Sequence, residues 1–175
     1  MDQLWAPWRL AYIAAAKPAE ADDPCFICQA LKEQDDRKNL VALRKPQSVV
    51  VLNRFPYNNG HLLIAPVQHK PTLGELTADE TLEVMETLRE MIDILNSIMH
   101  PEGYNVGLNL GRVAGAGVPG HLHWHLVPRW NGDTNFMPVF TNTKVISQSL
   151  ESLYDLIQSQ IRNSKTQIPK PKSER

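Results

Sequence analysis

The chain has 175 residues, enough for one domain, and it balances 18 Lys plus Arg against 19 Asp plus Glu. This balance argues against a protein-wide footprint for nucleic acid or a membrane surface. No apolar run approaches the roughly 18 residues that cross a bilayer. We therefore expect a globular protein with neither nucleic acid nor membrane as a partner.

Residues 1–24 read as an arm and linker, because large apolar side chains there are interrupted by Pro7 and Pro18. A secretory signal needs a basic start, whereas this chain carries Asp2, so we expect no signal peptide. Only two cysteines occur, as Cys25 and Cys28 in one CxxC. Together these features favour a reducing, cytoplasmic location.

The middle of the chain alternates short apolar runs with two longer helical patterns. A capping box at Thr77 and Glu80 begins a helix of about 22 residues, long enough to cover one face of a sheet. Its predicted inner stripe is Leu82, Met85, Leu88, Ile92 and Leu95. The remaining predicted elements are helices over 26–34 and 145–162 and strands over 40–43, 48–52, 61–65, 104–110 and 121–127.

This order of elements predicts an α+β fold in which an antiparallel sheet is covered by one long helix. We expect the domain to span residues 25–165. Residues 166–175, which are polar and basic, are expected to form a disordered tail.

Half of the six histidines stand at alternate positions, as His121, His123 and His125. A strand would place all three on one face, with Leu122, Trp124 and Leu126 on the other. Packing alone rarely explains such a pattern. Three imidazoles could hold a catalytic zinc, but same-face residues are spaced at about 6.5–7 Å, too far for all three to reach one ion at about 2.1 Å. The other interpretation is covalent catalysis, in which one imidazole attacks and its neighbours hold charge.

The CxxC at Cys25 and Cys28 has several possible uses: a redox pair, two buried thiols, or half of a zinc site. A closed tetrahedral zinc site needs two further ligands. The candidates are His61, His69, His100 and the three alternating histidines.

The run His-Leu-His-Trp-His-Leu-Val over 121–127 resembles the signature of the histidine triad (HIT) family of nucleotide hydrolases and transferases. The Trp-Ala-Pro-Trp-Arg arm, the Asn-Leu-Gly-Arg-x-Ala-Gly loop and the segment 128–136 are similar to those of bacterial HIT-type diadenosine tetraphosphate phosphorylases. The resemblance covers roughly residues 1–160. It implies a HIT-like fold that is catalytic over 25–165 and a homo-oligomer, either a dimer or a dimer of dimers.

The resemblance also implies roles for individual residues. His123 is expected to attack the α-phosphorus, with His125 donating to the phosphate and His61 lining the same pocket. A structural zinc is expected on Cys25, Cys28, His69 and His121. The implied substrate-binding residues are Asn53 for ribose, Asn109, Ala116 and Gly117 for phosphate, His125, and Trp130 for adenine.

One segment departs from the family. Hydrolase-branch members carry Gly-Gln-[Ser/Thr]-Val before the triad, whereas this chain has Ala116-Gly117-Val118-Pro119 and is one residue longer. The polar side chains with which that motif contacts phosphate are therefore missing here. Either backbone N–H groups take their place, or the molecule that accepts the nucleotidyl group differs.

The resemblance implies that the protein cleaves dinucleoside polyphosphates, such as diadenosine tetraphosphate, through a nucleotidyl-His intermediate with inorganic phosphate as acceptor. One alternative is a HIT hydrolase of dinucleoside polyphosphates or nucleoside phosphoramidates. A different class is a nucleotide-binding module without catalysis.

Overall fold

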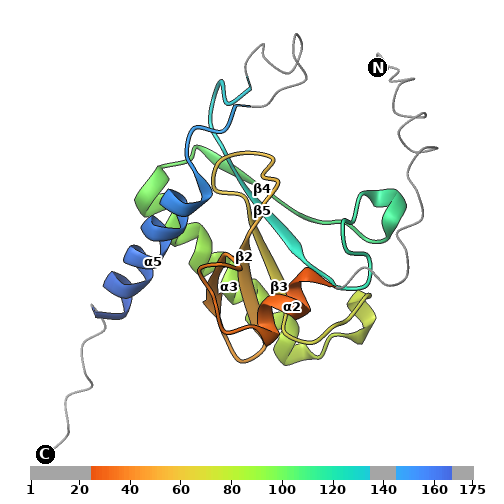
Figure 1. Ribbon diagram of the computed structural model, residues 1–175. Helices are drawn as coiled ribbons and strands as arrows, with labels where there is room; N and C mark the ends of the chain where they lie inside the picture. Colours follow the sequence, from red (N-terminus) through yellow and green to blue (C-terminus); the bar gives the residue numbers. More distant parts are fainter. Residues whose placement is uncertain (1–24, 135–144, 167–175) are drawn as a thin grey trace, which may run out of the picture.

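A computed structural model describes residues 25–134 and 145–166 (Figure 1). The predicted arm at residues 1–24 and the tail beyond residue 166 lie outside the described residues. Five strands form one sheet in the order β1-β2-β3-β5-β4, and every neighbouring pair is antiparallel. The strands are β1 (Val41–Arg44), β2 (Ser48–Leu52), β3 (Leu62–Pro66), β4 (Gly103–Leu108) and β5 (Trp124–Arg129). The predicted α+β class is confirmed.

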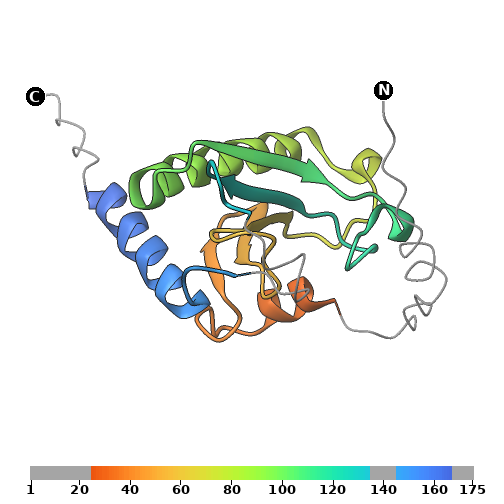
Figure 2. The same cartoon turned by 90° about the horizontal axis from the view of Figure 1, so that it is seen from above.

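The long helix α3 (Ala78–Met99) packs against β2 and β3. A second helix, α5 (Leu150–Thr166), packs against α3 and β1. Figures 1 and 2 both show α5 at one side of the molecule and the loop that carries the short helix η2 (Arg112–Ala114) at the other. A seven-residue helix, α2 (Phe26–Lys32), begins directly after Cys25. Within the described parts of the chain, no helix has both the length and the apolar character that a membrane crossing requires.

The predicted start of α3 is confirmed, and its predicted inner face is confirmed for Leu88 and Leu95 but wrong for two other residues. Thr77 and Glu80 form the capping box, and the helix has 22 residues. Leu82 and Met85, which were expected to be buried, are 59% and 42% exposed. Besides the predicted Leu88 and Leu95, the buried side chains of the helix are Glu80, Val84, Thr87, Met91 and Ile94.

Two polar side chains explain this rotated face of α3. Glu80 is bonded to the ammonium group of Lys70 in addition to the capping box, and both contacts compensate its burial. The Thr87 hydroxyl lies 3.0 Å from the hydroxyl of Ser48 on β2. Because these long-range partners satisfy Glu80 and Thr87, the helix can turn polar residues towards the sheet.

The predicted ends of two helices can also be compared with the structure. The last helix begins at Leu150 and not at Val145, because the Ser149 hydroxyl accepts a hydrogen bond from the Ser152 N–H and caps the helix there. The core includes Leu153, Ile157 and Ile161 of this helix, and Leu150 packs against it. At the end of α3, His100 has a left-handed backbone with φ of 48° and is exposed. It therefore terminates the helix, and among the described residues it does not belong to the group of Cys and His side chains that could hold a metal ion.

We expect Gly60→Ala to lower the free energy of unfolding by about 1–3 kcal/mol. Gly60 has φ of +80°, and an added Cβ would lie 2.8 Å from Pro128 Cγ. Urea unfolding of the two proteins measures the difference. Gly74→Ala is the matched control, since nothing lies within 4 Å of its added Cβ. Equal stability of the two variants would contradict this account of the turn.

Candidate active site and metal cluster

The sequence predicted that the three histidines of the triad share one strand, and this prediction is wrong. β5 begins at Trp124, so only His125 lies within it. The reason is that β4 ends at Leu108, which pairs with Trp124. Upstream of that point the Leu122 N–H donates instead to the Lys70 carbonyl at 2.8 Å. His121 and His123 therefore lie on an extended segment that leaves the sheet, and both are buried.

The orientation of the His123 ring follows from one hydrogen bond. Its Nδ1 lies 2.8 Å from the backbone oxygen of His121. Because a carbonyl oxygen only accepts, Nδ1 must carry the hydrogen. In the neutral ring the lone pair is then on Nε2, which makes Nε2 the nucleophilic atom.

A chain of hydrogen bonds orients the imidazoles of His61 and His125. The backbone N–H of Tyr57 donates to His61 Nδ1 at 3.0 Å, so the hydrogen of the neutral His61 ring is on Nε2. That Nε2 lies 2.9 Å from His125 Nδ1 and donates to it. His125 in turn must carry its hydrogen on Nε2. The ring of His125 also lies 5.2 Å from the ring of His123, edge to face.

The Nε2–H of His125 meets a second donor. The Asn109 Nδ2 group lies 3.4 Å from it and also donates to the Gly115 carbonyl at 3.3 Å. Two N–H donors cannot bond to each other, but both could donate to one anionic oxygen placed beside them. The arrangement is thus suited to a phosphate oxygen.

His125 is held in its neutral form by its surroundings. Burial, with the nearby His123 as a smaller cause, lowers the pKa of His125 from 6.5 to about 4. His61, which contacts it, is only 1% exposed. A neutral His125 can act as a directed N–H donor without adding a buried charge of its own.

The loop before the triad contributes differently from expectation. Ala116 is buried, and its backbone N–H donates to the Gly111 carbonyl at 3.3 Å, so this N–H is already used in the present conformation. Gly117 is exposed. Contact of these two residues with phosphate stays a prediction.

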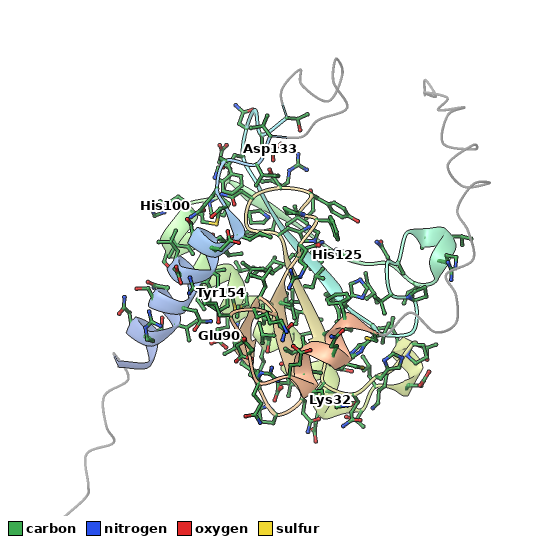
Figure 3. The ribbon with its side chains drawn as sticks, in the orientation of Figure 1. Lys32, Glu90, His100, His125, Asp133 and Tyr154 are labelled. Atoms are coloured by element: carbon green, nitrogen blue, oxygen red, sulfur yellow. The ribbon has the colours of Figure 1, made fainter. Side chains whose placement is uncertain are left out.

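Asn53 lies with the triad, whereas Trp130 does not. Asn53 Nδ2 is 3.2 Å from His61 Nδ1. The Trp130 indole N–H donates to the His100 carbonyl at 3.2 Å, and its backbone N–H donates to Asp133. In Figure 3, Asp133 lies beyond the far end of β5 from His125. Ribose binding by Asn53 and adenine stacking by Trp130 stay predictions.

The four predicted metal ligands come together from distant parts of the chain. The ligand atoms of Cys25, Cys28, His69 and His121 all lie within 4.8 Å of one another. His121 Nδ1 is 3.3 Å from Cys25 Sγ and 3.5 Å from Cys28 Sγ, and His69 Nδ1 is 3.2 Å from Cys28 Sγ. Bond lengths of about 2.3 Å for sulfur and 2.0–2.1 Å for nitrogen place the ligand atoms of a tetrahedral zinc about 3.3–3.8 Å apart. The cluster therefore fits a tetrahedral ion.

The hydrogen-bond partners of the cluster also suit a metal. His121 Nε2 lies 2.9 Å from the Pro66 carbonyl, so this nitrogen carries the hydrogen and Nδ1 turns its lone pair to the thiols. Burial lowers the pKa of His121, which keeps the ring neutral. Burial, together with Cys25, raises the pKa of the Cys28 thiol to about 11. A metal must therefore displace a proton from Cys28.

Two contributors were not found from the sequence. Gly120 lets the backbone approach His69, because a Cβ added there would lie 3.0 Å from His69 Nε2. The ring of Tyr57 is stacked on that of His125 at 5.6 Å between centroids. An aromatic residue four positions before His61 was the available signal for Tyr57, while Gly120 showed none beyond being a glycine.

The buried imidazole of His123, with its lone pair on Nε2 and with the N–H donors of His125 and Asn109 nearby, defines a candidate phosphoryl- or nucleotidyl-transfer site on an α+β sheet.

Residues 34–132 match the model of the HIT domain family. The chain is 37% identical over 161 residues to a Mycobacterium tuberculosis protein named AP-4-A phosphorylase, covering 90% of this chain and 83% of that protein. It is 29% identical over 115 residues to the asymmetrical bis(5'-nucleosyl)-tetraphosphatase of Schizosaccharomyces pombe, covering 65% of this chain and 63% of that protein.

Solved structures agree on the fold. A hypothetical histidine triad nucleotide-binding protein from Sulfolobus tokodaii matches with a TM-score of 0.66 at 24% identity, covering 86% of this chain and all of that chain. A zinc-bound histidine triad family protein from Mycobacterium smegmatis matches with a TM-score of 0.63 at 18% identity, covering 81% of this chain and 96% of that chain. The chain belongs to the HIT family.

The neutral state of His125 predicts a dependence of stability on pH. Its pKa in the folded protein is about 4, below the ordinary 6.5, so the unfolded chain binds more protons between these values. The free energy of unfolding should therefore fall by about 2 kcal/mol from this group as the pH drops from 6.5 to 4.

Chemical unfolding at several pH values compares the wild type with His125→Gln, whose side chain can still accept from His61. The variant should lose less stability over this range, and the comparison cancels acid effects at the metal cluster, which both proteins share. Identical pH slopes for both proteins would refute the assignment to His125.

Proposed function

We propose that this protein cleaves dinucleoside polyphosphates, diadenosine tetraphosphate among them, by transferring a nucleotidyl group first to His123 and then to inorganic phosphate. The observation that carries the proposal is the hydrogen bond from His123 Nδ1 to the His121 carbonyl, because it leaves Nε2 as the reacting atom. The names of the relatives from M. tuberculosis and S. pombe point to the same substrate class.

In the first step the Nε2 lone pair forms a bond to the α-phosphorus, and the bond from that phosphorus to the bridging oxygen breaks. With diadenosine tetraphosphate the leaving group is ATP, and AMP stays on His123. The ring becomes cationic as the bond forms, and the His121 carbonyl then accepts a stronger, charge-assisted hydrogen bond from Nδ1.

The charge that develops on the phosphate oxygens is met by neutral donors. The His125 Nε2 and Asn109 Nδ2 atoms lie 3.4 Å apart, close enough for both to donate to one such oxygen. His61 fixes the ring of His125 in the tautomer that donates there. These donors are in place before the substrate binds, so little reorganisation accompanies the reaction.

In the second step an oxygen of inorganic phosphate attacks the phosphorus, the bond to Nε2 breaks, and ADP leaves. Water in place of phosphate would give AMP. The departure of the 116–119 loop from the hydrolase pattern favours phosphate as the acceptor. A homo-oligomer and a cytoplasmic location stay predictions from the sequence.

The test is analysis of the products from diadenosine tetraphosphate with and without inorganic phosphate. We expect ADP plus ATP, and only when phosphate is present. His123→Asn should lower turnover by at least about 10³-fold while nucleotide binding stays within a few-fold, because only the nucleophile is lost.

Two results would overturn parts of this proposal. AMP plus ATP with no effect of phosphate would make the protein a hydrolase and leave the role of His123 intact. Residual turnover in His123→Asn close to that of the wild type would refute the covalent route. An absence of turnover with dinucleoside polyphosphates and phosphoramidates alike would favour the nucleotide-binding module.

We propose further that the cluster of Cys25, Cys28, His69 and His121 holds a structural zinc. Four protein ligands leave no open position for water, so such an ion would stabilise the fold and take no part in the reaction. It would join the start of α2 to the segment after β3 and the segment before β5.

Gly120→Ala should weaken zinc binding by about 10–100-fold, because the added methyl group displaces His69. Zinc content after dialysis against a graded chelator measures this, with Gly74→Ala as control. The wild type should retain one zinc per chain and unfold at a lower temperature once stripped. Wild-type protein that binds no zinc, or a Gly120→Ala variant that binds it as well as the control does, would contradict the assignment.

A further inference from the structure

The loop between β2 and β3 is fixed at both ends by asparagine side chains. Near its start, Asn53 Oδ1 accepts from the Phe55 N–H at 2.9 Å. Near its end, Asn58 is only 6% exposed and donates to the Pro128 carbonyl at 3.0 Å and to Asp133 at 2.8 Å. The segment between them is therefore held in place relative to β5.

Tyr57 lies between these two anchors and covers the paired imidazoles. Its ring centroid is 4.6 Å from that of His61 and 5.6 Å from that of His125, with an angle of only 19° between the planes in the second pair. The side chain is 52% exposed, so one side of the ring packs on the histidines while other parts face solvent. The neighbouring Phe55 is 84% exposed.

This position matters because His125 must stay neutral and correctly turned. The titratable groups that contact its ring are His61, His123 and the Tyr57 phenol, and the Asn109 amide faces it from the end of β4. A single hydrogen bond at Nδ1 leaves the imidazole some freedom to turn about its Cβ–Cγ bond. An aromatic face stacked on the ring limits this rotation and excludes water from one side.

We propose that Tyr57 is a positioning residue for the reaction: its ring holds the His61–His125 pair so that His125 Nε2–H points at the transferred phosphate. The inference rests on the proposed function for its catalytic consequence. The geometry of the rings stands independently of any substrate.

The first test uses the full-length protein with ¹⁵N-labelled histidine and no substrate. The ring nitrogen shifts of His125 report its tautomer and its titration. We expect the Nε2–H form in the wild type and in Tyr57→Phe. In Tyr57→Ala the pKa of His125 should rise by about one pH unit or more towards 6.5, because water reaches the ring.

The second test measures steady-state cleavage of diadenosine tetraphosphate. Tyr57→Ala should lower kcat about tenfold with KM changed by no more than about twofold, because a misdirected donor mainly affects the transition state. Tyr57→Phe should restore both parameters. Phe55→Ala, which removes an exposed ring from the same loop, is the matched control and should resemble the wild type.

Thermal unfolding and zinc content establish that each variant is folded. Tyr57→Leu, which keeps apolar bulk without an aromatic face, serves if Tyr57→Ala does not fold, and the same losses are expected of it. A variant without the ring that keeps both the wild-type titration of His125 and the wild-type kcat would overturn the proposal. So would equal losses in Tyr57→Phe, which would assign the effect to the hydroxyl. If the wild type itself does not cleave the substrate, the proposed function fails, and the NMR result still decides the role of the ring.

Discussion

The hydrogen bond between His123 Nδ1 and the His121 carbonyl decides which atom of the triad can react. It depends on a backbone that has left the sheet, because a carbonyl committed to a strand ladder would be turned towards a neighbouring strand. That segment is tied by the Leu122 N–H to the Lys70 carbonyl. Lys70 is itself paired with the capping glutamate of α3, so the reactive imidazole is linked to the start of the long helix.

Residues 121–125 carry imidazoles that face two different sites. His121 turns its ring to the thiols, while His123 and His125 lie edge to face and form the proposed phosphate-binding pair. Three of the rings at these sites have named partners. The Tyr57 N–H orients His61, the Pro66 carbonyl orients His121, and His61 Nε2 orients His125. Backbone partners are set by the fold, so these contacts fix the tautomers of the rings that make them.

Local signals in the sequence predicted the elements well, and long-range contacts account for what they missed. The capping box at Thr77 needs only four adjacent residues, so it was evident. The inner face of α3 was misjudged because Glu80 and Thr87 find partners on other segments. The first residue of β5 depends on where β4 stops pairing with it, and the residues of β5 alone do not reveal this point. The metal ligands were chosen by family resemblance, since Cys25 and His121 are 96 positions apart.

His121 combines two roles that a side-chain substitution would mix. Its ring faces the cysteines, but its backbone oxygen accepts from the proposed nucleophile, His123. An alanine scan that reads only activity would therefore place His121 among the reacting groups, although its imidazole points away from them. Only a comparison in which backbone geometry and ring chemistry are altered separately, as by an ester in place of an amide, would reveal that this residue serves the chemistry through its main chain.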